Sequence, residues 1–438
     1  MYGGREAAFK PTRMYLRRLP EQITDRGASQ LRLSFSLLGA GLNEMPQNDC
    51  WMLPEGIQES LPEEAARLEL LRRRLLDLFD SWGYELVMPP FIEFIDSLLV
   101  GTGHDLDLQT FKLTDQVSGR MLGIRADMTP QVARIDAHNL KTSLPTRLCY
   151  IGTVLHTRAD PLEKTRSPLQ VGAELYGHAG VESDFEIVQL MLESLSTVGI
   201  RNIHIDLGHV GIFRGLAQQA GLSESQECEV FDVMQRKAFT ELDVLLEKYG
   251  LSGEIRKMLQ ELPRLNGSTD IVEIARKKFE SANQSVKDAL LYLETLRVKI
   301  SDCFPELPIN FDLAELRGYH YQTGVVFAAF VPGYGREIAR GGRYDEIGKV
   351  FGRARPATGF SADVKVLANL SQSKKLESEG AIFAPSEDDS NLSRAIAELR
   401  RSGRRVIQQL PGQLGTVEEM SCQYRLVKEQ SAWVVVTA

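Results

Sequence analysis

The chain has 438 residues, 43% of them hydrophobic and 25% charged, so it is long enough for two or three domains with a well-buried core. Its net charge of -8 argues against a polyanion as the main partner, because nucleic-acid-binding proteins generally carry a basic domain or stripe. No stretch reaches the ~18 to 20 apolar residues of a membrane span, and the start lacks the apolar segment of a signal peptide, so we expect a cytoplasmic protein with no membrane partner.

The first 49 residues show no pattern that predicts a folded element. Basic residues are scattered there among Pro, Gly and Ser without a helical or strand period, so no face could be buried. Acidic residues such as Glu6 and Glu21 are unusual for a transit peptide. We interpret residues 1–49 as a disordered extension, or as the product of a start codon placed too early, with Met45 or Met52 nearer the true start.

A folded core is expected over residues 50–370, and its first element is a helix from about Pro62. Leucines recur from Leu68 to Leu78 at spacings of three and four residues, which places them on one face of a helix.

The next predicted elements are a strand, a helix and a hairpin. Met121 to Arg125 is a short apolar run that predicts a strand, and Thr129 to Asn139 has helical character. Arg147 to His156 and Leu169 to Tyr176 flank the polar loop from Thr157 to Pro168, which predicts an antiparallel hairpin with a long tip.

A helix and a strand lead into a helical insertion. Ser183 and Glu186 have the spacing of a capping box at the start of a helix, and Asn202 to Leu207 is strand-like. Residues 215–300 are charged, helical in pattern and poor in strand signals. We therefore expect a helical subdomain inserted into the sheet.

The sheet resumes after the insertion and ends with a helix. Ile309 to Leu316, Val325 to Phe330 and Glu337 to Ala339 are strand-like and separated by Gly-containing turns, and Ser361 to Leu370 predicts a helix. The predicted fold class is therefore α+β, an antiparallel sheet flanked by helices.

A small, truncated α/β unit is expected over residues 379–438, after a polar linker from Ser371 to Gly380. Its predicted elements are two strands around a helix and a last strand: Ala381 to Ala384, Asn391 to Arg401, Arg405 to Gln408 and Ala432 to Val436.

The cysteines predict neither a disulfide framework nor a metal site. They are odd in number, far apart and without C-x-x-C or Cys/His ligand spacing, as in reduced cytosolic proteins. The histidines also lack ligand spacing. We expect no metal and no cofactor.

Six short motifs give the sequence its specific signal, whereas phosphate-cradle, zinc and nucleophile-elbow signatures are absent. In chain order they are Ile124-Arg-Ala-Asp-Met-Thr129, Cys149-Tyr-Ile-Gly152, Gln170-Val-Gly-Ala-Glu-Leu-Tyr-Gly177, Leu316-Arg-Gly-Tyr-His-Tyr-Gln-Thr-Gly324, Gly341-Gly-Arg-Tyr-Asp345 and Gly359-Phe360. Their order resembles the catalytic core of histidyl-tRNA synthetase, a class II aminoacyl-tRNA synthetase. The residues within the motifs, above all Leu-Arg-Gly-Tyr-His-Tyr, resemble those of the regulatory subunit of ATP phosphoribosyltransferase.

The resemblance implies a site for free histidine. An amino acid needs acceptors for its ammonium, a cation for its carboxylate and a polar partner for its imidazole. In this sequence the resemblance implies that Asp127, Thr129 and Gln170 hold the ammonium, Glu174 the imidazole and Arg317 the carboxylate. Tyr321 completes the matched set. Two positions depart from the synthetase pattern: Asp127 stands where the family has Glu, and Gln322 stands where it has a second Tyr.

Other interpretations of these residues remain open. Gln170 and Glu174 alternate with apolar residues and could be the solvated face of a sheet. Gly341, Gly342 and Tyr344 could be structural, because paired glycines usually mark close backbone approach. Arg340 and Arg343 could be ordinary surface charges.

The residues needed for aminoacyl adenylate formation are altered. Class II enzymes meet the charge of the transition state with two arginines, and at these places the chain has His156 and Val366. Losing one such donor costs on the order of 3 kcal/mol, although Lys365 could compensate if it turned inward. The residues after Gly380 amount to roughly half of what the anticodon-binding domain of the family needs.

The resemblance therefore predicts a non-catalytic subunit. It would bind L-histidine as an effector and confer activation and feedback inhibition on the short-form catalytic subunit of ATP phosphoribosyltransferase, in hetero-octamers built on a class II-type dimer. The alternative is a divergent histidyl-tRNA synthetase or synthetase-like ligase. A tRNA sensor would need a basic face that the sequence does not display.

Overall fold

The computed structural model describes residues 52–100, 104–159, 164–315, 318–319, 321–371 and 380–438. The predictions for residues 1–49, for Arg317 and for most of the linker from Ser371 to Gly380 lie outside the described residues.

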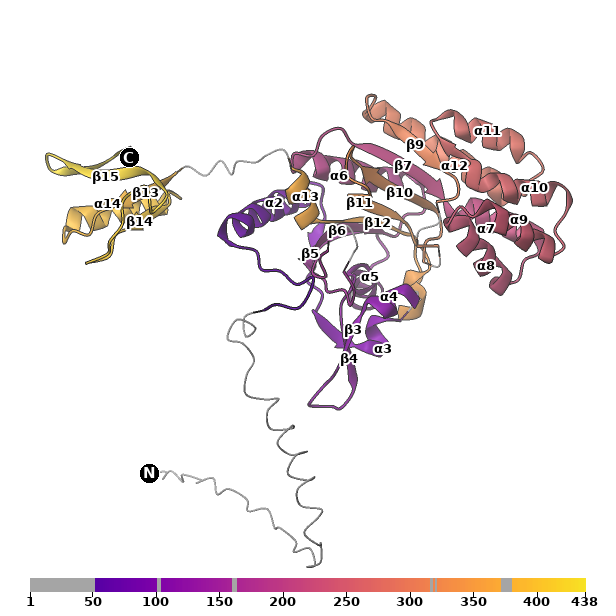
Figure 1. Ribbon diagram of the computed structural model, residues 1–438, viewed down its shortest axis with the longest axis horizontal. Coiled ribbons are helices and arrows are strands. Elements are labelled where there is room, and N and C mark those ends of the chain that lie inside the picture. Colours follow the sequence, from indigo (N-terminus) through magenta and orange to yellow (C-terminus); the bar gives the residue numbers. More distant parts are fainter. Residues whose placement is uncertain (1–51, 101–103, 160–163, 316–317, 320, 372–379) are drawn as a thin grey trace, which may run out of the picture. The chain divides into compact units, whose positions relative to one another are not determined.

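The described core is built on a nine-stranded sheet with the order β1-β5-β6-β12-β11-β10-β7-β9-β8 (Figure 1). In that order the strands are β1 (Glu85–Leu86), β5 (Thr146–Thr153), β6 (Leu169–Tyr176), β12 (Ala357–Asp363), β11 (Ala339–Arg343), β10 (Val325–Phe330), β7 (His204–His209), β9 (Ile309–Asp312) and β8 (Asn266–Gly267). Neighbouring strands are antiparallel, except that β1 is parallel to β5 and β7 to β9. The hairpin predicted around the loop from Thr157 to Pro168 is the antiparallel pair of β5 and β6.

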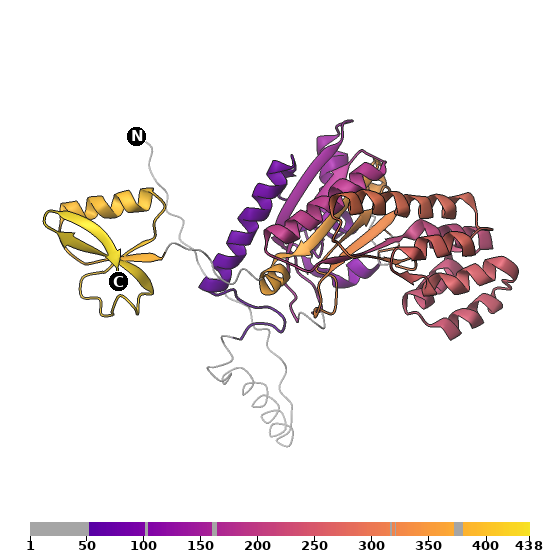
Figure 2. The same cartoon turned by 90° about the horizontal axis from the view of Figure 1, so that it is seen from above.

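Helices cover one face of this sheet and enclose the main hydrophobic core (Figure 2). They are α2 (Pro62–Ser81), α6 (Val181–Thr197), α12 (Gln284–Cys303) and α13 (Val364–Leu370). Helix α2 begins at Pro62 as predicted, because proline suits the first turn of a helix, and it buries Leu68, Leu71 and Leu75. On β6, Val171, Ala173 and Leu175 face this core.

The opposite face of the sheet carries a second, smaller core. Helix α5 (Thr129–Arg134) continues into a π-helix (Ile135–Leu140), so the predicted helix from Thr129 to Asn139 is confirmed in extent. Here Met128 and Val132 pack with the rings of Tyr150, Tyr176 and Tyr344. This is the face on which the polar residues of β6 lie, because side chains alternate along a strand.

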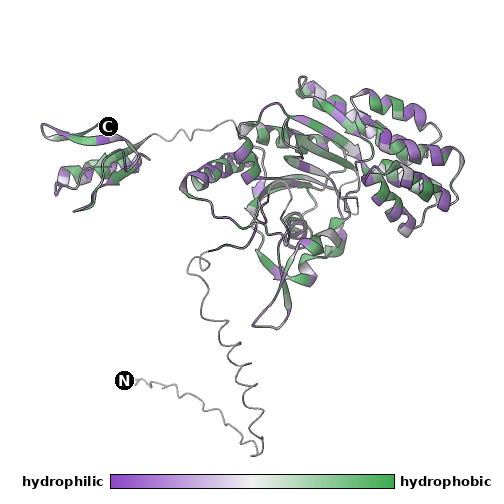
Figure 3. Cartoon of the chain, in the orientation of Figure 1, coloured by the Kyte–Doolittle hydropathy of each residue, from purple (hydrophilic) through white to green (hydrophobic). Residues whose placement is uncertain are grey.

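Helices occupy most of the chain between β7 and β9. They are α7 (Val210–Ala220), α8 (Glu224–Gln235), α9 (Phe239–Lys248), α10 (Gly253–Glu261), a 3-10 turn (Leu262–Arg264), α11 (Asp270–Lys278) and α12. In Figure 3 these helices alternate apolar inner stripes with hydrophilic outer ones. Residues 215–300 are helical as predicted, but the first helix begins earlier, at Val210, and β8 adds a short strand that pairs with β9.

A separate three-stranded sheet, with the order β2-β4-β3, lies within residues 92–124. Its strands are β2 (Ile92–Phe94), β3 (Phe111–Thr114) and β4 (Met121–Ile124), accompanied by the short helices α3 (Ile95–Leu98) and α4 (His104–Gln109). In Figure 3 the strands of this sheet include residues coloured as hydrophobic.

The C-terminal residues form a four-stranded sheet with the order β14-β13-β15-β16. Its elements are β13 (Ala381–Ala384), α14 (Ser390–Arg401), β14 (Val406–Gln408), β15 (Cys422–Glu429) and β16 (Ala432–Thr437). The sequence prediction missed β15, in which polar residues outnumber the two buried ones, Cys422 and Leu426.

Several predicted boundaries are wrong: the strand predicted from Ile309 to Leu316 ends at Asp312, and three other predictions fail because tertiary contacts override the local pattern. Helix α6 begins at Val181 with Gly180 as its N-cap, so Ser183 is inside the helix and forms no capping box. Strand β11 covers Ala339–Arg343 rather than Glu337 to Ala339. Residues 361–363 belong to β12, which is paired on both sides, and α13 begins after the side chain of Asp363 accepts the Lys365 N–H.

The described helices include none that is long and apolar enough to span a membrane.

Candidate amino-acid binding site

Glu174 is the centre of a buried group of polar side chains on the second face of the sheet. Its side chain projects from β6 and is 1% exposed. The Tyr150 hydroxyl, from β5, donates to Oε1 at 2.9 Å, and the Tyr344 hydroxyl donates to Oε2. Glu174 pairs in register with Gly359 of β12, and a Cβ on Gly359 would lie 1.5 Å from Oε2. The carboxyl group therefore lies flat over the sheet only because the opposite residue is glycine.

Burial changes the charge state of this carboxyl group. Loss of solvent raises the pKa of Glu174 to about 8, although the hydroxyls of Tyr344 and Tyr150 act in the opposite direction. At neutral pH the protonated, uncharged form is therefore favoured. A neutral carboxyl group can either donate or accept a hydrogen bond. In a neutral imidazole one nitrogen donates and the other accepts, so either nitrogen could pair with this carboxyl group.

Asp127 and Gln170 form the half-buried edge of the group. Asp127 Oδ1 accepts from Gln170 Nε2 at 2.8 Å and from the Thr129 N–H at 3.0 Å, and Gln170 Oε1 accepts from the Met128 N–H at 2.9 Å. The Thr129 hydroxyl lies 3.0 Å from that of Tyr150. One chain of hydrogen bonds thus runs from Asp127 through Thr129 and Tyr150 to Glu174.

Tyr321 and Gln322 close the group from the segment before β10. The ring of Tyr321 stacks on that of Tyr344, with centroids 5.0 Å apart and planes 16° apart. Gln322 is 8% exposed, and its buried Oε1 has no hydrogen-bond partner among the residues that the structure describes. That oxygen lies 2.6 Å from where a Cβ on Gly342 would be, and Gly342 pairs with Gly359. Two paired glycines therefore form the floor beneath Glu174 and Gln322.

The structure brings together every predicted site residue that it describes. Tyr150 and Tyr344 join them, and we call the whole set the polar cluster: Asp127, Thr129, Tyr150, Gln170, Glu174, Tyr321, Gln322 and Tyr344. Arg317 lies outside the described residues. The alternative that Glu174 belongs to a solvated sheet face is wrong, because the second core covers it.

The sequence analysis did not select Tyr150 or Tyr344 as site residues, although both lie in the motifs. The signal that could have found Tyr150 is the cross-strand register, since it lies opposite Gly172 and a Cβ there would meet its hydroxyl at 2.4 Å. A large polar side chain facing a glycine on the next strand indicates a built site, but register is not visible in a single motif.

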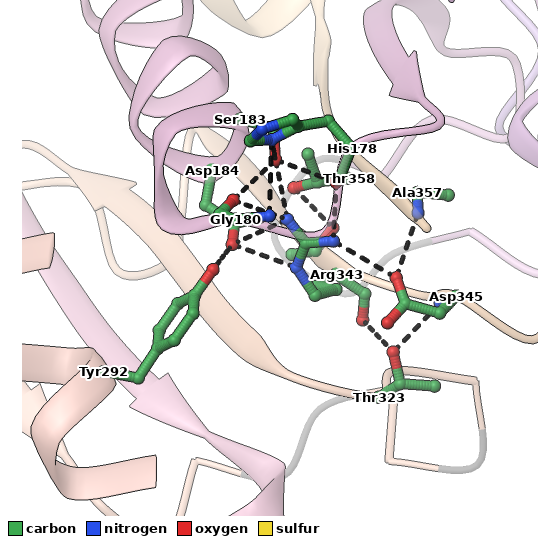
Figure 4. A network of polar contacts seen from close by, with 11 residues as sticks. His178, Gly180, Ser183, Asp184, Tyr292, Thr323, Arg343, Asp345, Ala357 and Thr358 are labelled. Carbon is green, nitrogen blue, oxygen red and sulfur yellow. Dashed lines mark hydrogen bonds and ion pairs between the residues drawn. The ribbon is translucent and has the colours of Figure 1, made fainter. Parts of the chain in front are cut away.

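Arg343 holds the end of β11 in a second buried network (Figure 4). Its Nε donates to Asp184 Oδ2 at 3.0 Å and its Nη2 to the Ser183 hydroxyl at 2.8 Å, both on α6. Tyr292 of α12 donates to the same Asp184 oxygen. Arg343 is 5% exposed, so its interpretation as a surface charge is wrong.

Arg340 of the same strand behaves differently. Its side chain is 62% exposed and contacts Glu337 at 3.3 Å. This confirms the interpretation of Arg340 as a surface charge.

The family resemblance matches His156 and Val366 to the two synthetase arginines. His156 Nε2 lies 3.0 Å from the carbonyl oxygen of Ala126. Val366 is 7% exposed and packs in the main core. The Lys365 ammonium donates to the Ser167 carbonyl at 2.7 Å.

Comparison with known proteins identifies the family. Residues 56–367 match the family model of histidyl-tRNA synthetase, and residues 379–436 match that of the ATP phosphoribosyltransferase subunit HisZ C-terminal domain. The ATP phosphoribosyltransferase regulatory subunit of Methylococcus capsulatus is 61% identical over 392 residues, which cover 89% of this chain and 97% of that protein. The chain belongs to the ATP phosphoribosyltransferase regulatory subunit family.

Other family members and solved structures support this family assignment. The regulatory subunit of Alkalilimnicola ehrlichii is 54% identical over 386 residues, covering 88% of this chain and 96% of that protein. A structure from Bacillus halodurans, described as an ATP phosphoribosyltransferase regulatory subunit/histidyl-tRNA synthetase, aligns with a TM-score of 0.75 at 27% identity, covering 85% of this chain and 96% of that one. Histidyl-tRNA synthetase from Nostoc, at 18% identity and a TM-score of 0.70 over 88% of this chain and 97% of that one, shows the shared fold alone. The predicted class II synthetase-like fold and family are confirmed.

Proposed function

We propose that this chain is the non-catalytic regulatory subunit of a cytoplasmic ATP phosphoribosyltransferase and that it binds L-histidine. Histidine binding would confer feedback inhibition on the short catalytic subunit, which the regulatory subunit also activates, at the first step of histidine biosynthesis. The observation that carries the proposal is the polar cluster: in a member of this family, the residues matched to an amino-acid site are joined by hydrogen bonds around Glu174.

The polar cluster and Arg317 together offer a partner for each end of histidine. Asp127, Gln170 and Thr129 supply oxygen acceptors for the ammonium at the half-buried edge. Glu174 faces the imidazole, and its low charge at neutral pH suits a neutral ring. Arg317, matched by the family resemblance, supplies the cation for the carboxylate. A ligand so bound would exchange some of the hydrogen bonds within the polar cluster for its own.

The chemistry of a synthetase is not part of the proposal. The transition state of adenylate formation needs fixed cations, and the positions of the two family arginines hold His156, whose ring contacts a backbone carbonyl, and the buried Val366. The alternative of a divergent histidyl-tRNA synthetase or synthetase-like ligase would have to supply these charges from elsewhere.

Exposed apolar side chains support self-association. They belong to the three-stranded sheet and the residues next to it, and all are more than 40% exposed: Met88, Phe91, Ile92, Leu108, Val117 and Met121. Exposed apolar residues can mark interaction sites. We propose that this part of the chain forms the dimer on which the hetero-octamer with the catalytic subunit is built.

Calorimetric titration with histidine tests the binding proposal. Wild type should bind, and Arg317→Ala should weaken binding by about tenfold to a hundredfold, because a charge-assisted hydrogen bond to the carboxylate is lost. Arg236→Ala is the control, because this side chain is 57% exposed and pairs with Glu241 on the helical insertion, and the variant should bind like wild type. Unchanged affinity in a folded Arg317→Ala protein would place the effector site elsewhere.

A further inference from the structure

The described residues between Gly318 and Thr323 contact the helical insertion as well as the polar cluster. Tyr319 is 4% exposed. Its ring centroid lies 5.4 Å from that of Phe213 on α7 and 4.9 Å from that of Phe231 on α8. Its hydroxyl donates to the carboxylate of Glu227, also on α8. This one side chain is therefore embedded between two helices of the insertion.

Arg214 of α7 holds the backbone of the same segment. Its guanidinium carbon lies 4.8 Å from the centroid of the Tyr319 ring. Its Nη2 donates to the carbonyl oxygens of Tyr319 at 3.2 Å and of Gln322 at 3.3 Å. These two carbonyls lie on either side of Tyr321, so a single arginine fixes the turn that carries Tyr321.

The other side of the turn belongs to the polar cluster. Tyr321 stacks on Tyr344, whose hydroxyl holds Glu174. The next residue, Gln322, carries a buried side-chain oxygen, Oε1, to which none of the described residues donates. Buried acceptors are rarely left unpaired in native proteins, and an N–H group of a ligand would complete this one.

The turn itself is short and closed by its own backbone. The N–H groups of Tyr321 and Gln322 donate to the Gly318 carbonyl at 2.8 and 2.7 Å, and Gly318 has a φ of +71°, which glycine adopts at no steric cost. A movement of Tyr319 would therefore carry Tyr321 and Gln322 with it.

We propose that Tyr319, Glu227 and Arg214 form a clamp through which helices α7 and α8 position Tyr321 and Gln322, so that histidine binding at the polar cluster is coupled to the helical insertion. The inference rests on the proposed function, since it takes the polar cluster as the histidine site. Coupling is reciprocal: the clamp raises histidine affinity, and bound histidine stabilises α7 and α8. The three clamp residues are positioning residues, and none of them needs to touch the ligand.

The test uses the full-length chain and two readouts, calorimetric affinity for histidine and amide hydrogen exchange with and without histidine. Tyr319→Phe keeps the buried ring and removes only the hydroxyl that donates to Glu227. Arg214→Lys keeps the charge but replaces the planar guanidinium, whose Nη2 donates to both carbonyls and whose plane lies over the Tyr319 ring. Glu227→Gln keeps an acceptor for the Tyr319 hydroxyl and is the conservative variant.

A matched control exists on the same insertion. The Tyr249 hydroxyl donates to Glu229 Oε2 of α8 at 2.6 Å, so Tyr249→Phe also removes one tyrosine–glutamate hydrogen bond from α8. That tyrosine is not part of the segment that enters the polar cluster.

In wild type and in Tyr249→Phe, histidine should slow amide exchange in α7 and α8. In Tyr319→Phe and Arg214→Lys, affinity should fall by about fivefold, the equivalent of one hydrogen bond, and the protection of α7 and α8 should be lost. Glu227→Gln should stay close to wild type in both readouts.

Two results would overturn the inference, and they are distinguishable. If Tyr319→Phe and Arg214→Lys melt earlier but keep wild-type affinity and protection, the contacts are only structural and the proposed function stands. If wild type gives no binding heat, the proposed histidine site is wrong. The proposed coupling of that site to α7 and α8 is then wrong as well.

Discussion

At the scale of single residues, the charge state of Glu174 depends on partners that no local pattern reveals. The motif that contains it was visible in the sequence, and its family resemblance gave it a role. Its burial and its two tyrosine donors depend on the register of β5, β6 and β12. The sequence could therefore identify the residue but not its environment.

Glu174→Gln should change how stability depends on pH. The pKa of Glu174 is about 8 in the folded chain and near the ordinary value for a carboxyl group when unfolded. Between these values the folded state keeps a proton that the unfolded state releases, so rising pH lowers the free energy of unfolding, by up to roughly 1.4 kcal/mol per pH unit. Glutamine stays neutral and removes this slope.

Urea unfolding of both proteins between pH 5 and pH 8 measures the effect. The stability of wild type relative to Glu174→Gln should fall by roughly a few kcal/mol across this range. A difference that stays constant with pH would mean that Glu174 is ionised in the fold.

At the scale of elements, periodicity predicted the helices and strands well where one face is apolar and failed where a tertiary contact sets the boundary. Helix α2 and the hairpin of β5 and β6 belong to the first kind. Ser183 belongs to the second, because its hydroxyl accepts from Arg343 instead of capping α6. Strand β11 contains Gly341 and Gly342, which have low strand propensity, and it forms because its neighbours β10 and β12 pair with it.

The Arg343 network should contribute strongly to stability, because it joins β11 to α6 and α12. Arg343→Ala would leave Asp184 buried without its partner, which costs about 3 to 5 kcal/mol in comparable buried pairs. Arg340→Ala, in the same strand but exposed, should change stability by less than about 0.5 kcal/mol. Chemical unfolding compares the two variants, and equal effects would show that the buried network is energetically neutral.

At the scale of the whole molecule, the sequence predicted a class II synthetase-like core and a small C-terminal α/β unit, and the family matches agree with both. The division into residues 1–49, 50–370 and 379–438 stays a prediction. The surface that contacts the catalytic subunit could not be predicted, because interaction surfaces leave no fixed period in a sequence.

The part of the chain around the three-stranded sheet, where large apolar side chains are exposed, should hold the chain in a dimer. Replacing Met88 and Met121, which are 76% and 52% exposed, by Glu would place charges in that interface and should shift the protein to monomers in sedimentation velocity. Leu414→Glu, at a residue 94% exposed in the C-terminal unit, is the control. A dimer that survives the double substitution would exclude this surface.

The chain should not form histidyl adenylate. The family resemblance implies that His156 and Val366 replace the two arginines. The loss of two donors of about 3 kcal/mol each would leave roughly 10⁻⁵ of the activity if the losses add. ATP–pyrophosphate exchange with histidine measures this directly. Exchange at a thousandth of the rate of a synthetase would favour the enzymatic alternative.

The most direct test of the regulatory function is the activity of the short catalytic subunit of ATP phosphoribosyltransferase, measured alone and with this chain, across a histidine titration. The account predicts that the chain raises the activity and that histidine then lowers it, with Arg317→Ala shifting the inhibition to higher histidine concentrations while the activation remains. A catalytic subunit whose activity and histidine response are the same with and without the chain would contradict it.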